Sequence, residues 1–192
     1  MNADETALAE ALTRERASAR RSTIRLCVGA GVAIFILIAL LFGGFNHAKT
    51  KQAINAAKLQ ISLLENALMA YQADTGSVPA HGVPDGTGGT GKIYFALYPG
   101  APGARIYLPE LDPAADPQGW LGGATGPGPH KIFDPWGNEY RYRSNVSGSS
   151  TIYALNPDFD LWSAGPDGMT TAGPGGAYDP TDPANLDDIR NW

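Results

Sequence analysis

The feature that most constrains the fold is a stretch without proline that runs from Arg25 to Ala73. It begins with the mostly apolar and uncharged run Leu26–Phe45, after which lysine, glutamine, asparagine and glutamate return. An apolar run of ~20 residues is long enough to cross a bilayer as a helix. In the second part apolar residues recur at spacings of three and four: Ile54, Ala57, Ile61, Leu64, Leu68 and Tyr71. The pattern predicts one long helix whose second half carries a single apolar stripe.

Charge is distributed unevenly along the chain. Among its 192 residues, 14 are basic and 19 acidic, which argues against nucleic-acid binding. Five arginines precede the apolar run, at positions 14, 16, 20, 21 and 25. Positive charge beside a membrane span indicates a cytoplasmic N-terminus and an exported C-terminal part. The one cysteine, Cys27, lies inside the apolar run, so we expect no disulfide framework.

These patterns divide the chain into three parts. We expect residues 1–21 to be a cytoplasmic leader or tail and residues 22–45 the transmembrane half of the helix. Residues 46–192 would form a periplasmic globular domain of modest size. Within it, residues 80–131 are a loop region rich in glycine and proline, and residues 132–192 carry the strands and an acidic C-terminal loop.

The fold class predicted for the domain is α+β. Gly76 and Pro79 should end the helix, because glycine accepts a left-handed conformation and proline cannot continue a helix. Strand signals fall at residues 138–144, 151–155 and 159–163, and a short helix or strand is expected at 93–98. Three antiparallel strands with one apolar face need a cover, which the helix stripe supplies. Ile189 and Trp192 are expected to pack back on the domain.

Four sequence patterns together indicate a family. They are the helix exit at residues 67–79, DPWGNEY at Asp134–Tyr140, FDLWSAGPDG at Phe159–Gly168, and DDIRNW at Asp187–Trp192. In combination they resemble the major pseudopilin of type II secretion systems, in the type IV pilin-like superfamily. The resemblance covers the amphipathic helix and everything from Asp134 onward.

The resemblance implies a pilin-like structural protein rather than an enzyme. Such subunits associate through their N-terminal helices into a filament in the bacterial envelope. They contact other pseudopilins and an inner-membrane platform, and they help to export proteins across the outer membrane. The expected location is therefore the inner membrane, crossed once, with the C-terminal domain in the periplasm.

The resemblance also implies a calcium ion in the C-terminal loop. Calcium takes six to eight hard oxygen ligands. By analogy, Asp167 and one or both of Asp187 and Asp188 would supply side chains, and carbonyl groups near Ala164 and Met169 would complete the shell. The residues alone leave another interpretation open, since aspartates beside glycine and proline are usually solvated turn residues. Asp179 and Asp182, in the same loop, could shift the ligand set.

The chain departs from the family at its N-terminus. Family members carry a glycine at a cleavage point and a glutamate early in the apolar run. Here residues 21–26 read RSTIRL, which has neither, and Arg25 is nearest to the position of the glutamate. This departure favours an alternative function, a non-polymerising, inner-membrane-anchored envelope protein that uses a pilin-like head as an interaction module.

Catalysis is not predicted. The three histidines, His47, His81 and His130, are far apart in sequence and lie at the membrane exit or in loops. No arrangement of serine, histidine and aspartate, no HExxH and no phosphate-binding glycine motif occurs in the sequence.

Overall fold

The computed structural model describes residues 49–81, 86–116, 118–124, 126, 128–145, 153–171 and 178–192. Residues 50–192 form one unit, and the description below concerns this unit. The predicted transmembrane half of the helix lies outside the described residues, as does His47. Within the described ranges, no helix has the length and apolar character that membrane crossing requires.

The long helix covers residues 49–75 of the described chain. It ends as predicted at Gly76, which has a φ of 81° and donates its backbone N–H to the carbonyl of Gln72 at 2.8 Å. Only glycine adopts this left-handed conformation without strain, and the bond satisfies one of the carbonyls that the helix end leaves free.

The predicted apolar stripe of the helix faces the core. Ala57, Leu64 and Leu68 are fully buried, Ile61 is nearly so, and Ile54 and Tyr71 pack against them while partly buried. Each fully buried leucine or isoleucine contributes about 1.5–3 kcal/mol relative to an exposed one. The stripe therefore holds the helix to the rest of the domain, as the periodicity predicted.

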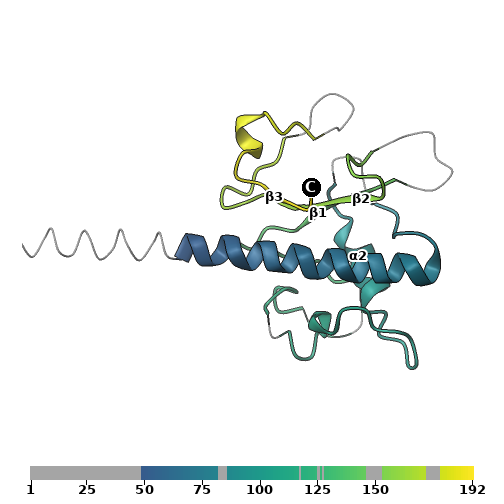
Figure 1. Cartoon of the computed structure of the whole chain (residues 1–192). Helices are drawn as coiled ribbons and strands as arrows, with labels where there is room; N and C mark the ends of the chain where they lie inside the picture. The colour runs from purple at the N-terminus through teal and green to yellow at the C-terminus, as the bar shows by residue number, and fades with distance from the viewer. Residues whose placement is uncertain are drawn as a thin grey trace, which may run out of the picture. The chain divides into compact units, whose positions relative to one another are not determined.

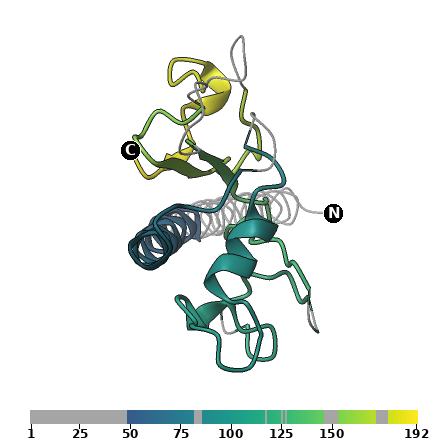
Figure 2. The same ribbon diagram turned by 90° about the vertical axis from the view of Figure 1, so that its right-hand side faces the viewer.

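The sheet has three antiparallel strands in the order β1-β2-β3: β1 at Arg141–Ser144, β2 at Phe159–Ser163 and β3 at Ile189–Arg190. In the register Tyr142 is opposite Leu161, and Ser163 is opposite Ile189. The α+β class is confirmed, and so is the strand at 159–163. Figures 1 and 2 both show the sheet on one side of the long helix and the loops of residues 98–124 on the other.

The predicted strand at 151–155 is wrong in its described part, because residues 153–155 belong to no strand. The side chain of Asn145 accepts hydrogen bonds from the backbone N–H groups of Tyr153 and Ala154, at 2.8 and 2.9 Å. The carboxylate of Asp160 takes the N–H of Leu155 in the same way, at 2.7 Å. Side chains thus accept the hydrogen bonds of backbone N–H groups that would pair with a neighbouring strand if this segment were a strand. The third strand of the sheet is instead β3, which comes from the end of the sequence.

Both faces of the sheet are covered. Tyr142 and Leu161 point toward the helix core, while Trp162 lies on the opposite face. There the rings of Tyr178 and Trp192 contact Trp162 edge-on, with centroid distances of 5.7 and 6.0 Å. All five residues of β2 are consequently buried. In a sheet with only one covered face, the residues on the other face would be exposed. The expected packing of Ile189 and Trp192 on the domain is confirmed.

The described part of the loop region contains the helix α2 at Thr90–Leu97 and a short 3-10 turn at Pro109–Leu111, and another 3-10 turn lies nearer the C-terminus, at Pro183–Asn185. Its buried side chains join the same core as the stripe: Ile93, Leu97, Leu111 and Trp120. At the end of the long helix, Asp74 accepts hydrogen bonds from Arg105 and from the hydroxyl of Tyr107. These contacts fix the loop region to the helix.

Candidate calcium site

The turn at Asp134–Asn138 positions the loop that follows β2. Asp134 Oδ1 accepts the backbone N–H groups of Trp136 and Asn138, at 3.0 and 2.8 Å. Asp134 Oδ2 accepts the hydroxyl of Ser163, the last residue of β2, at 2.5 Å. Asn138 Nδ2 then donates to the carbonyl of Gly165 at 3.0 Å. A single buried carboxylate and one amide therefore hold the start of the loop in place.

The same loop lies against Asp187. Gly165 has a φ of 66°, and a Cβ atom at this position would lie 2.6 Å from both the carbonyl oxygen and the carboxylate Oδ2 of Asp187. The backbone N–H of Asp167 points to Asp187 Oδ2 at 3.4 Å. Glycine is needed here both for the backbone conformation and for the close approach. Asp167 and Asp187, separate in sequence, are thus brought together.

Asp188 has a different environment. Its carboxylate accepts hydrogen bonds from the hydroxyl of Tyr178 at 2.8 Å and from that of Thr170 at 3.2 Å. The pKa of Asp188 is raised to about 6, mainly by burial and to a smaller extent by the negative charges of Asp187 and Asp167, against the effect of the two hydroxyl donors. Asp188 therefore feels the negative charge of Asp187 and of Asp167, which a bound cation would offset.

The remaining predicted residues lie around this loop. Ala164 is buried at the end of β2, and the side chain of Met169 is 56% exposed while its N–H donates to Asp167 Oδ1 at 2.8 Å. Asp179 and Asp182 are engaged locally, accepting the N–H groups of Thr181 and Ala184. Hydrogen bonds from Thr181 lower the pKa of Asp179.

The donor set fits calcium in its chemistry. The backbone of Asp167 lies against the carboxylate of Asp187, and the glycine-containing loop at Asp167 also offers carbonyl oxygens. Carboxylate and carbonyl oxygens are the ligands that calcium prefers. In the described part of the chain, no group of three or more histidine, cysteine, aspartate or glutamate side chains is placed to hold a metal ion. Backbone carbonyls would therefore have to supply much of the shell.

One residue that organises the site was not predicted. Asn185 is buried, accepts the N–H of Thr171 at 2.8 Å, and donates to the carbonyls of Thr171 and Asp179 at 2.9 and 2.7 Å. It ties the chain before Asp187 to the chain after Met169. Nothing in the sequence distinguishes this asparagine from other polar loop residues, because its role depends on contacts made across the loop.

The two described histidines lie in separate parts of the domain. His81 Nδ1 is 2.9 Å from the carbonyl of Ser144, and His130 Nε2 is 2.7 Å from that of Gly126. Ser144 is fully buried, and its hydroxyl already accepts the backbone N–H of His81 at 3.0 Å. A ring nitrogen that faces a carbonyl acts as a donor, so His81 is poorly placed to serve as a base toward Ser144.

Neither a known protein family nor a curated protein matches the chain.

Proposed function

We propose that this protein is a structural subunit of a type II secretion pseudopilus or a related pilin-like filament, and that it takes part in protein export across the outer membrane. The observation that carries the proposal is the packing of the helix stripe on a three-stranded antiparallel sheet completed by residues 189–190. The sequence patterns predict a helix laid across a small antiparallel sheet, with the third strand expected at residues 151–155 instead. Many unrelated proteins combine a helix and a sheet, so the fold supports the proposal only together with the motifs.

The motifs support it because they meet in space. Asp134 and Asn138 of the DPWGN motif bond to Ser163 and Gly165 of the FDLWS-containing motif, at 2.5 and 3.0 Å. The side chain of Asn191, from the terminal motif, accepts the backbone N–H of Leu161 at 2.9 Å. Three sequence segments that resemble the family thus form one connected structure, as residues of a shared fold would.

In this proposal a calcium ion stabilises the head. Asp167 and Asp187 would supply carboxylates, and carbonyls near Ala164 and Met169 would contribute further oxygens. Asp188 would stabilise the loop from the side through Tyr178 and Thr170. The ion would supply positive charge beside the carboxylates of Asp167 and Asp187, holding the loop of residues 164–170 to the chain at Asp187.

Assembly would use the N-terminal half of the helix. In the proposed arrangement Leu26–Phe45 crosses the inner membrane once, with the N-terminus in the cytoplasm and the head in the periplasm. Packing of this apolar segment between copies would build the filament. Other pseudopilins and the inner-membrane platform would be its partners. This part of the proposal depends on the sequence alone.

A second candidate function follows from residues 21–26. Since the glycine and the glutamate of the family are missing there, the protein would instead be a non-polymerising envelope protein anchored in the inner membrane. Its pilin-like head would serve as an interaction module, and no filament would form.

Mass spectrometry of the protein extracted from its native membrane distinguishes the two candidates. A processed pilin would give a mature chain that begins near Ser22 and carries an N-methyl group. An anchored, unprocessed protein would retain its N-terminal residues, including all five arginines that precede the apolar run. The second result would contradict the first proposal in its processed form.

A further inference from the structure

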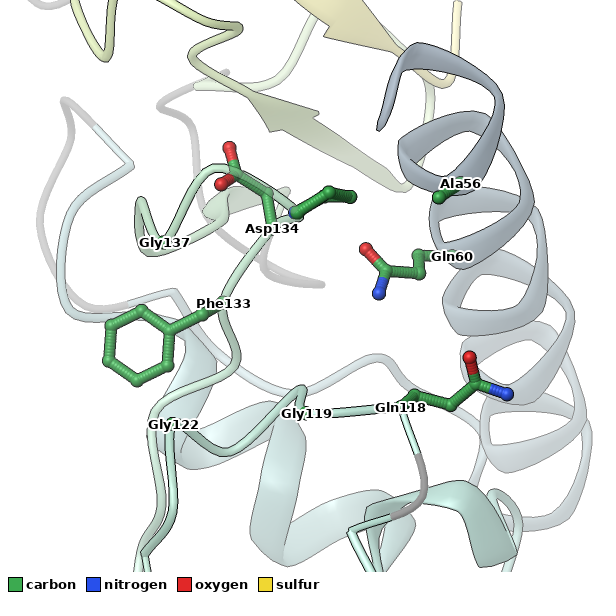
Figure 3. A pocket seen from close by; sticks show the side chains of 9 residues that line it. Ala56, Gln60, Gln118, Gly119, Gly122, Phe133, Asp134 and Gly137 are labelled. Atoms are coloured by element: carbon green, nitrogen blue, oxygen red, sulfur yellow. The ribbon is translucent and has the colours of Figure 1, made fainter. Parts of the chain in front are cut away.

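We draw no further inference here: the strongest candidate, the cavity of about 450 Å³ between the long helix at Gln60 and the turn at residues 134–137 (Figure 3), carries none, because the buried side chains of Gln60 and Asp134 already have hydrogen-bond partners within the domain and nothing in the described part of the chain shows what would occupy the space.

Discussion

Tyr140 donates a hydrogen bond to Gln60 Oε1 at 2.6 Å, and both side chains are buried. The two residues are 80 positions apart in sequence. Tyr140 immediately precedes β1 and Gln60 lies on the long helix, so this bond joins the sheet to the helix. It also fixes the orientation of the Gln60 carboxamide.

Replacing Tyr140 by phenylalanine tests this connection. Tyr140→Phe keeps the ring in the core but leaves Gln60 Oε1 buried without a donor, which should cost about 1–3 kcal/mol. Urea unfolding of residues 46–192 measures the loss. The double variant Gln60→Met with Tyr140→Phe should lose less than Tyr140→Phe alone, because no buried acceptor remains unpaired. An equal or larger loss in the double variant would contradict the assigned role.

The ion pair between Arg143 and Asp160 should be far more important for stability than the one between Arg105 and Asp74. The first pair is 3.1 Å apart with side chains 1% and 0% exposed, while the second is 65% and 37% exposed. Asp160→Asn removes the carboxylate that pairs with this buried guanidinium, which should cost about 3–5 kcal/mol. The matched change Asp74→Asn should cost about 1 kcal/mol or less. Similar losses in the two variants would contradict this interpretation of their burial.

High pH should destabilise the domain through its buried tyrosines. Burial raises the pKa of Tyr140 and of Tyr142 well above the ordinary value near 10. Above pH 10 the unfolded chain releases protons that the folded chain keeps, so the free energy of unfolding should fall as pH rises. Each such tyrosine contributes at most about 1.4 kcal/mol per pH unit. Urea unfolding between pH 9 and 11 measures the slope, and Tyr142→Phe should reduce it; a flat profile above pH 10 would contradict the prediction.

Calcium should stabilise residues 46–192. A ligand that binds only the folded state at 100 times its dissociation constant adds about 2.7 kcal/mol. We expect the melting temperature to rise with calcium and to fall again with a chelator. Asp167→Ala should abolish the rise, whereas Asp179→Ala should preserve it, because Asp179 is engaged in a local turn with Thr181. Absence of a shift at millimolar calcium in the unsubstituted protein would refute the site.

Much of the described fold could be predicted because it depends on local patterns. The spacing of Ile54, Ala57, Ile61, Leu64 and Leu68 predicts an amphipathic helix with one apolar stripe. Gly76 indicates the end of this helix because of its own backbone preference. The strand at 159–163 was predicted for a similar reason, since aromatic and apolar residues are concentrated there. These signals need no knowledge of distant contacts.

The third strand was predicted in the wrong place because its position depends on contacts between residues that are distant in sequence. Tyr153–Leu155 have the composition of a strand, but Asn145 and Asp160 take their backbone donors. Ile189–Arg190 are too short to give a strand signal, and they pair with β2 because the preceding residues return the chain to that edge. Which segment forms the third strand therefore depends on side-chain hydrogen bonds, and these cannot be predicted from the spacing of residues.

The candidate calcium site was predicted only through the family resemblance. The sequence shows many aspartates in the last thirty or so positions, and turn residues of this kind are usually solvated. The structure separates them by environment: Asp167 and Asp187 meet at Gly165, Asp188 bonds to Tyr178, and Asp179 and Asp182 serve local turns. Asn185, which helps to hold this arrangement, could not be identified from sequence, because it acts through contacts with the loop across from it.

The most direct test of the central claim is electron microscopy of material sheared from the surface of cells that produce this chain, with gold-labelled antibodies against residues 46–192. The proposed function predicts thin fibres decorated along their length, with the mature chain as a fibre component. Label confined to the inner-membrane fraction, with no decorated fibre in the sheared material, would contradict the claim that this pilin-like head belongs to a filament subunit.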